Sequence, residues 1–430
     1  MLPILTNNND TLTSLELNKC NLEPDQIKCI AKFLQKNKTL SILDLSGNKV
    51  DNIAAAKSLA QAMKKHPELF FLNLSNCTLG ATTSIEISSY GHSYTTYNCG
   101  ENDEVLSALL GGCKKLTTLL LENNHIQAEE SAALVAKFLK NNKSLTVFSI
   151  ENNEMGDANT KVICEALTTC TEISEICLRS TKLALPTFIN NKQMMNLTRV
   201  DMSGDYYWHG DSSEPRTISG PGAKLIAKYL ASNPALIELN LSRNDINGHG
   251  AKKIALALKK NTNLQHLNLE YNRLTKACVP AFTDALRNND TLLSLNLGGN
   301  QIKVESGRAV LIKDALCDTT SLEAIAGSNH TCILSITDRG KTYRNDLTHE
   351  YEMKNINSLD SEGMKIRYKV VLALFSYNKD LFHPRSFDEV PLELMPRLLE
   401  LVQLEVGYGE FGNGITQRST KKKMKKILVV

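Results

Sequence analysis

Residues 236–246 read LIELNLSRNDI, residues 264–274 read LQHLNLEYNRL, and residues 292–302 read LLSLNLGGNQI. The three stretches share an eleven-position motif with apolar residues at positions 1, 4, 6 and 11 and Asn at position 9. Further copies begin at Leu12, Leu40, Leu69, Leu116, Leu145, Ile173 and Leu197. Most copies start 28 or 29 residues apart, and the exceptions are spacings of 47, 24 and 39 residues. Ten copies of one motif indicate a repeat protein.

Each part of the repeat has a physical reason. Alternating apolar residues predict a short strand with one face turned inward. Position 9 holds Cys20, Asn48, Cys77, Asn124, Asn153, Thr181, Asp205, Asn244, Asn272 and Asn300. An Asn amide both donates and accepts, so we expect it to bond the backbone at the turn that leaves each strand. Between the motifs, stretches such as residues 130–142 (ESAALVAKFLKNN) place Ala and Leu at helical spacing. Stacked repeats would bury these faces in a curved solenoid, with strands on its concave side.

Residues 12 to about 325 resemble the leucine-rich repeat proteins of the ribonuclease-inhibitor type, whose repeats have the same motif and about the same length. The resemblance implies an α/β horseshoe, with parallel strands on the concave face and helices on the convex face. It also implies a non-enzymatic scaffold for protein–protein interaction, of which a protein inhibitor is one form. The repeats also resemble those of Ran GTPase-activating proteins, so a GTPase regulator is the alternative. Those proteins usually end in an acidic tail, whereas this chain ends in a Lys-rich one.

The C-terminal part departs from the repeat. We assign residues 1–325 to the repeat domain, with an eroded eleventh copy beginning at Leu322. Residues 326–411 contain two predicted helices and are expected to cap the exposed end of the solenoid. Residues 412–430 form a basic tail. This C-terminal region resembles, more loosely, leucine-rich repeat effectors of intracellular bacteria, which implies secretion and action in a host cytosol.

Two insertions interrupt the repeats, near residues 86–104 and 204–219. Each follows a strand and precedes a helix, so both are expected on one edge of the horseshoe. They concentrate aromatic residues in a chain that has only 6% of them: Tyr90, Tyr94 and Tyr97 in the first, and Tyr206, Tyr207 and Trp208 in the second. Tyr and Trp are common anchors of protein interfaces. The alternative is that the insertions fold back onto the neighbouring edge and bury these rings.

Side-chain alternation places motif positions 3, 5 and 7 on the concave face. Over ten motifs these positions hold eight acidic residues and two basic ones, Arg179 and Arg199, which gives −6 on a chain whose net charge is +3. Such a face favours a basic partner and disfavours nucleic acid. Phe71, Leu120 and Val147 fall on neighbouring strands and suggest an apolar patch. The alternative is a solvated face with scattered apolar residues.

No catalytic motif stands out. The stretch RGKT at residues 339–342 has Ser335 where a phosphate-binding loop needs its first Gly. His330 and Cys332 lie two residues apart, and we interpret them as structural. An enzyme with its site in residues 326–411 remains a minor alternative. We therefore predict no enzyme, no cofactor and no metal.

The composition also bears on the cellular compartment in which the protein is expected. Eleven cysteines without a C-x-x-C pair indicate free thiols in a reducing, cytoplasmic compartment. No apolar run reaches the roughly 18 residues of a membrane span, and no signal peptide is visible. We expect a monomer that binds a protein with a basic surface. The predicted binding residues are Phe71, Leu120, Val147, Glu151, Glu175, Asp201, Tyr206, Tyr207, Trp208 and Glu238.

Overall fold

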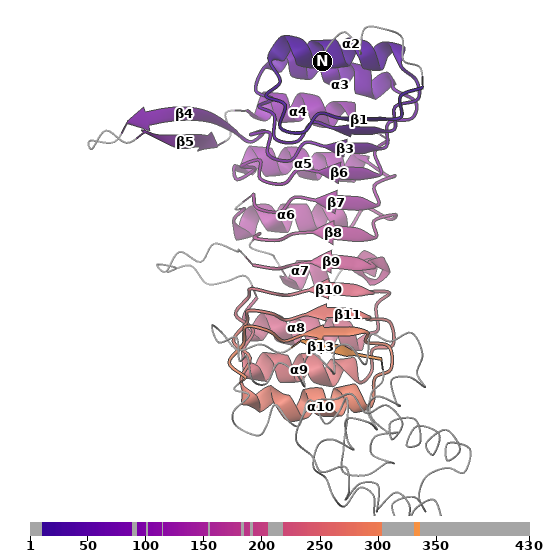
Figure 1. Ribbon diagram of the computed structural model, residues 1–430, viewed down its shortest axis with the longest axis vertical. Helices are drawn as coiled ribbons and strands as arrows, with labels where there is room; N and C mark the ends of the chain where they lie inside the picture. Colours follow the sequence, from indigo (N-terminus) through magenta and orange to yellow (C-terminus); the bar gives the residue numbers. More distant parts are fainter. Residues whose placement is uncertain are drawn as a thin grey trace, which may run out of the picture.

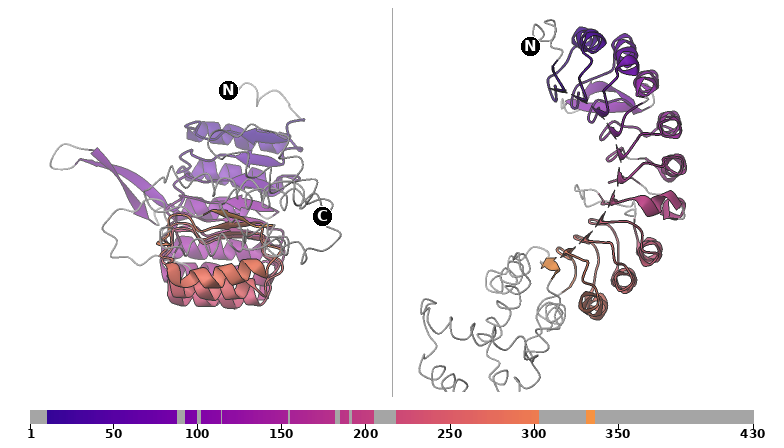
Figure 2. Two further views of the ribbon diagram at one scale, coloured as in Figure 1. Left: turned by 60° about the horizontal axis from the view of Figure 1, so that its bottom comes forward. Right: turned by 90° about the vertical axis from the view of Figure 1, so that its right-hand side faces the viewer.

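A computed structural model describes residues 11–87, 93–99, 102–113, 115–153, 155–181, 185–189, 192–204, 218–302 and 331–335. Within these residues the chain forms a curved stack of strand–helix repeats, seen from its side in Figure 1 and as an open arc in the right panel of Figure 2. Strands line the inside of the arc and helices the outside. The predicted horseshoe is therefore confirmed.

The inner layer is one parallel sheet of eleven strands, in the order β1-β2-β3-β6-β7-β8-β9-β10-β11-β12-β13. The strands are β1 (Ser14–Glu16), β2 (Ile42–Asp44), β3 (Phe71–Asn73), β6 (Thr118–Leu120), β7 (Val147–Ser149), β8 (Glu175–Cys177), β9 (Arg199–Asp201), β10 (Glu238–Asn240), β11 (His266–Asn268), β12 (Ser294–Asn296) and β13 (Ile333–Ser335). Equal motif positions pair across the sheet, as in Leu239 with Leu267. These central residues point away from the concave face and are buried.

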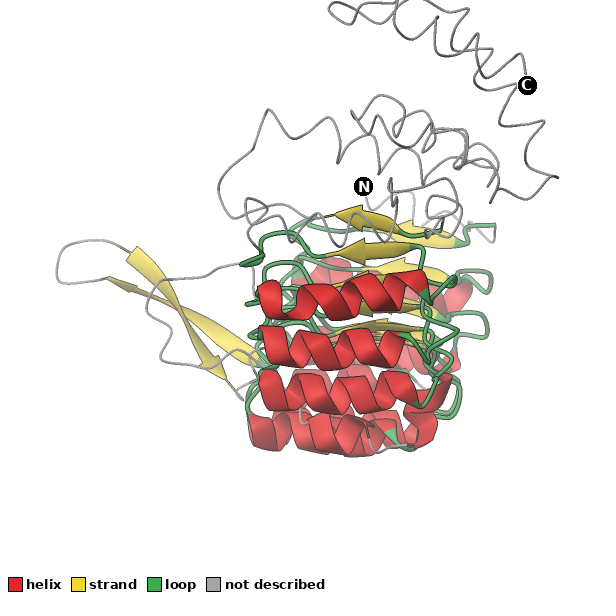
Figure 3. Ribbon diagram, turned by 90° about the horizontal axis from the view of Figure 1, so that it is seen from below, coloured by secondary structure: helices red, strands yellow, loops and turns green. Residues whose placement is uncertain are grey.

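The outer layer consists of helices, which Figure 3 shows stacked side by side. They are α2 (Pro24–Lys36), α3 (Ile53–Lys65), α4 (Asp103–Gly112), α5 (Glu129–Asn141), α6 (Asp157–Leu167), α7 (Leu185–Ile189), α8 (Gly220–Ala231), α9 (Gly248–Leu258) and α10 (Val279–Arg287), with short 3₁₀ turns η1 (Lys192–Asn196) and η2 (Lys276–Cys278). Their inner faces are rich in Ala, as in α3, where Ala55 and Ala56 are fully buried. Small side chains let the helices approach the sheet closely.

Buried Asn side chains at motif position 9 connect successive repeats. In Asn272, Oδ1 accepts from the backbone N–H of Ile246 (3.1 Å), and Nδ2 donates to the carbonyls of Leu241 (2.9 Å) and Leu269 (3.0 Å). One carbonyl belongs to its own repeat and the other to the preceding one. The predicted turn bond is thus confirmed, and each Asn also joins two repeats.

A second Asn ladder, which the sequence analysis did not identify, lies where helices lead into strands. Asn37, Asn142, Asn261 and Asn289 stand three residues before position 1 of the motif and are at most 5% exposed. Asn261 shows the pattern. Its Nδ2 donates to the carbonyl of Leu230 (3.0 Å) in the preceding repeat, and its Oδ1 accepts from the N–H of Leu264 (2.7 Å).

The first insertion is a β-hairpin of two strands, β4 (Ala81–Ile87) and β5 (Ser93–Cys99), which pair antiparallel and form a sheet of their own. It begins five residues before the predicted start and projects away from the stack (Figure 1). Gly80 precedes it and lies against the backbone of His125, where a Cβ atom would not fit. Gly204 lies in the same way against Arg243, just before the second insertion. Residues 205–217 of that insertion lie outside the described residues.

Strand β13 pairs with β12, with Leu334 beside Leu295. The sheet therefore continues past residue 325, into the segment predicted to form the cap. The predicted copy at Leu322, the rest of the predicted cap and the basic tail lie outside the described residues. The nine cysteines whose side chains are described are all free.

Candidate functional site

The concave face brings the predicted apolar residues together. Phe71 lies on β3 opposite Thr118 of β6, and Thr118 lies opposite Val147 of β7. Leu120 follows on β6, two residues from Thr118. The structure adds Ile42 of β2, which pairs with Phe71. All four apolar side chains are half-buried and lie on the adjacent strands β2 to β7, with Thr118 between Phe71 and Val147. We call these four residues the apolar patch.

Two carboxylates lie beside the apolar patch, toward the ends of β6 and β7. Glu122 accepts a hydrogen bond from Ser149 Oγ (2.9 Å), and Glu151 accepts one from the Cys177 thiol (2.9 Å). Burial raises the pKa of Glu122, and the charge of Glu151 raises it further. Burial also raises the pKa of Cys177, helped by Glu151, so this thiol stays protonated. We call these carboxylates the Glu122–Glu151 pair.

Two polar atoms near the Glu122–Glu151 pair, Arg179 Nε and Asn152 Oδ1, lack a hydrogen-bond partner among the described residues. Arg179 Nε lies 4.0 Å from Glu151 Oε2, too far for a hydrogen bond. The same Nε atom is buried and has no hydrogen-bond partner in the described part of the chain, and neither does Asn152 Oδ1. Buried polar atoms normally find partners in a protein or its ligand. Arg179 Nε and Asn152 Oδ1 are therefore two buried polar atoms at this end of β7 and β8 that lack a described partner.

The second half of the face pairs part of its charge within the chain. Arg199 of β9 lies between Glu175 of β8 and Glu238 of β10, with Nε–Oε2 of Glu238 at 2.8 Å and Nη1–Oε2 of Glu175 at 3.6 Å. Asp201 accepts from Asn240 Nδ2 (2.9 Å) and Ser203 Oγ (2.7 Å). The uniformly acidic face expected from the sequence is thus uneven, because Glu175, Asp201 and Glu238 already have partners.

The predicted aromatic anchors are only partly placed. Tyr94 and Tyr97 lie on β5, in register with Glu86 and Thr83 of β4. Tyr206, Tyr207 and Trp208 lie outside the described residues, as does Tyr90, so their role stays a prediction.

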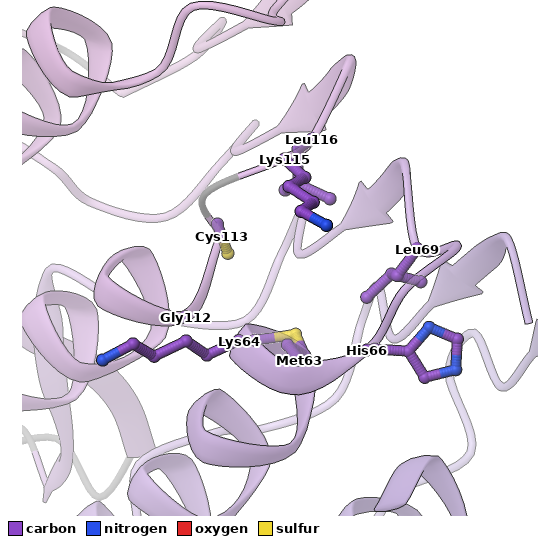
Figure 4. A pocket seen from close by; sticks show the side chains of 8 residues that line it. All are labelled: Met63, Lys64, His66, Leu69, Gly112, Cys113, Lys115 and Leu116. Carbon is purple, nitrogen blue, oxygen red and sulfur yellow. The ribbon is translucent and has the colours of Figure 1, made fainter. Parts of the chain in front are cut away.

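A small pocket lies away from the concave face, where α3 and α4 lead into β3 and β6 (Figure 4). It is lined by Met63, Lys64, His66, Leu69, Gly112, Cys113, Lys115 and Leu116. His66 and Cys113 occupy the positions that hold Asn in the second ladder. Burial lowers the pKa of His66, and the charge of Lys38 lowers it further, so its ring is neutral. Its Nε2 atom is buried without a described partner.

No group of three or more potential metal ligands was found among the described residues. Of the helices in that same part of the chain, none has the length and apolar character needed to cross a membrane.

Comparison with known proteins agrees with the repeat. A family model described as Leucine Rich repeat matches residues 36–57, 232–255, 260–277 and 288–311. Among curated proteins, NACHT, LRR and PYD domains-containing protein 4C from Mus musculus is 28% identical over 175 residues, which is 38% of this chain and 18% of the relative. NACHT, LRR and PYD domains-containing protein 5 from Bos taurus is 29% identical over 166 residues, or 36% and 15% of the two chains. The chain thus spans less than a fifth of the length of these relatives.

Among solved structures, the leucine-rich repeat-containing protein LegL7 from Legionella pneumophila aligns with 73% of this chain and 92% of its own, at 18% identity and a TM-score of 0.42. A structure of the TLR13–ssRNA13 complex aligns with 69% of this chain and 37% of its own, at 18% identity and a TM-score of 0.38. Ten copies of the motif and the stacked strands and helices give the chain the leucine-rich repeat architecture, and the Leucine Rich repeat family model matches it over four segments.

Proposed function

We propose that the chain is a protein-binding scaffold whose concave face, from β2 to β8, receives a partner with a basic surface. The observation that carries this proposal is the apolar patch beside the Glu122–Glu151 pair. A parallel sheet normally has both faces covered, whereas this concave face has no cover among the described residues. The partner would place an apolar side chain against Phe71 and Val147, and a Lys or Arg beside the two carboxylates.

Electrostatics supports a cationic group at this position. Glu122 and Glu151 raise each other's energy when both are ionised, and a partner's cation would relieve that repulsion. The Arg199 bridge shows the same arrangement made within the chain, with one guanidinium between two carboxylates. An anionic ligand such as nucleic acid would be repelled here.

The oligomeric state and the cellular location also belong to the proposal. We propose a monomer that acts in a cytosol, and secretion into a host cell as a bacterial effector is supported only by the looser resemblance of the C-terminal sequence. A ribonuclease-inhibitor-like inhibitor uses the same kind of surface. For a GTPase regulator, an Arg or Asn on the strand-to-helix edge would have to contact the nucleotide, and nothing in the described part of the chain singles one out.

Affinity capture from a eukaryotic lysate tests the proposal when three baits are compared. They are the full chain, a Phe71→Ala/Val147→Ala variant and a Leu256→Ala control, whose changed side chain lies on the convex face and is 41% exposed. We expect a partner retained by the full chain and the control and depleted at least tenfold by the concave variant. A partner captured equally by all three baits binds elsewhere and would refute the site.

A further inference from the structure

The loops at the two edges of the horseshoe carry opposite charge. The helix-to-strand edge comprises the last four residues of each helix and the loop up to the next strand. Side chains described there include eleven basic and five acidic residues. The opposite strand-to-helix edge, from each strand through the first four helical residues and without the hairpin, has six basic and twelve acidic residues. The right panel of Figure 2 looks onto the basic edge.

Lysines dominate the basic edge, and they face solvent. Ten of its eleven basic residues are Lys, including Lys64, Lys65, Lys228 and Lys260, and all eleven are exposed. Among the described residues, Lys259 is the only one of these lysines in an ion pair, with Asp284. Lys near a helix C-terminus is favoured by the helix dipole, which accounts for some of this charge.

Exposed apolar side chains on the same edge need a different explanation. The residue just before a strand is usually Ser or Thr, and its hydroxyl donates to the carbonyl of the preceding repeat. Examples are Ser41 to Thr13 (2.9 Å) and Thr146 to Thr117 (3.1 Å).

Five of the described strands lack this hydroxyl, and two of those five have Gln265 and Cys332 at the position. The other three have Phe70, Ile237 and Leu293 there, with 43%, 40% and 39% of the residue exposed. These are three of the five large apolar residues that are exposed in the described part of the chain. Each gives up a hydrogen bond and presents apolar surface to water.

We propose that the helix-to-strand edge docks on an anionic lipid bilayer. Phe70 with Lys64 and Lys65 would form one contact, and Ile237 and Leu293 with Lys228 and Lys260 a second. Apolar side chains that enter the headgroup region, surrounded by Lys, are the combination that peripheral membrane proteins use. Nucleic acid is a poorer match, because the edge has a single Arg and offers aliphatic rather than stacking side chains at its second contact.

The shape of the molecule suits this orientation. The two contacts lie in repeats near opposite ends of the described arc, so together they would set the horseshoe with one edge on the membrane. The hairpin β4–β5 leaves from the opposite edge (Figure 1) and would point away from the lipid. The concave face would remain open to a protein partner from the side. Docking does not depend on the proposed concave site and is tested separately.

Vesicle flotation with the full chain tests the docking edge. Wild-type protein should float with vesicles of phosphatidylcholine containing 30 mol% phosphatidylserine and not with phosphatidylcholine alone. Replacing Phe70, Ile237 and Leu293 by Thr restores the residue type that other repeats hold there, so this variant should fold. Each Lys near an anionic surface raises partitioning by roughly fivefold. We therefore expect partitioning onto the vesicles to fall at least about tenfold in the Thr variant. The variant Lys64→Gln/Lys65→Gln/Lys260→Gln should show a fall of at least the same size.

The matched controls change residues on the convex side. Leu256→Thr is the control for Leu293→Thr, and Lys224→Gln/Lys252→Gln/Lys253→Gln is the control for the edge lysine variant. Both controls should float like the wild type. The proposal fails if wild type does not float, or if the edge variants float like wild type, since the Lys-rich tail would then account for binding. It also fails if the Thr variant keeps full binding while the lysine variant loses it, because the edge would then be a general polyanion surface.

Discussion

Asn272 shows how a single side chain holds successive repeats together. Its amide is fully buried, and its hydrogen bonds with Ile246 and Leu241 reach the preceding repeat, while the one to Leu269 stays within its own. The recurrence of Asn at one motif position predicts this role. The second ladder had an equally regular signal, Asn three residues before the first Leu, but it falls outside the motif and was missed.

Replacing Asn272 with Ala should destabilise the fold by roughly 1–3 kcal/mol, because buried backbone groups lose their partners. Chemical denaturation measures the change. Asn288→Ala is the control, since Asn288 is exposed and bonds only within its own helix, to Asp284. If the two variants lose the same free energy of unfolding, the Asn ladder makes no specific contribution to stability.

His66 interrupts the second ladder, and Asn should repair it. Its backbone (φ −73°, ψ 130°) matches that of Asn37 (φ −62°, ψ 138°), so Asn fits without strain. We expect His66→Asn to stabilise the fold by about 1 kcal/mol.

Because the folded pKa of His66 is lowered, the wild type should also lose stability as the pH falls through 6.5, the ordinary value. Unfolding measured from pH 5 to 8 should show this loss in the wild type and a smaller one in His66→Asn; parallel curves would contradict the explanation.

At the scale of elements, the helices of the repeats were easier to predict than the two strands of the first insertion. The helical stretch expected at residues 130–142 corresponds to α5, Glu129–Asn141, because its buried face repeats with helical spacing. The hairpin was not predicted as a pair of strands. Its segments ATTSIEI and SYTTYNC are rich in β-branched and aromatic residues, which favour strands. The aromatic residues of the insertion favour an interface or a buried edge and do not by themselves predict strands.

Gly80 positions that hairpin by packing against the backbone of His125. Gly80→Ala should cost about 1–3 kcal/mol, because a Cβ atom must displace backbone rather than a flexible side chain. Gly156→Ala is the matched control, since a Cβ atom there meets nothing within 4 Å. Thermal unfolding compares the two. If both variants unfold alike, the close approach at Gly80 is not a constraint on the fold.

At the scale of the molecule, the repeat predicted the architecture but not the distribution of charge. The concave positions predict an acidic face, and within it Arg199 of β9 pairs with Glu175 of β8 and Glu238 of β10, an arrangement that only the strand register reveals. The eleventh strand was also missed, because its motif has Thr331 where other copies have Leu or Ile. The binding surface that we propose is therefore smaller than the one expected from the sequence, and covers β2 to β8.

The most direct test of the central claim is the association rate of the captured partner with charge-reversed variants. Glu122→Lys/Glu151→Lys changes the concave pair, and Glu129→Lys/Glu130→Lys changes two exposed carboxylates at the start of α5, with the same change in net charge. If a basic surface docks at the Glu122–Glu151 pair, the first variant associates at least about tenfold more slowly at low salt, and the difference shrinks as salt rises. The control stays within about twofold of wild type. Equal slowing by both variants, or by neither, would contradict binding at the concave pair.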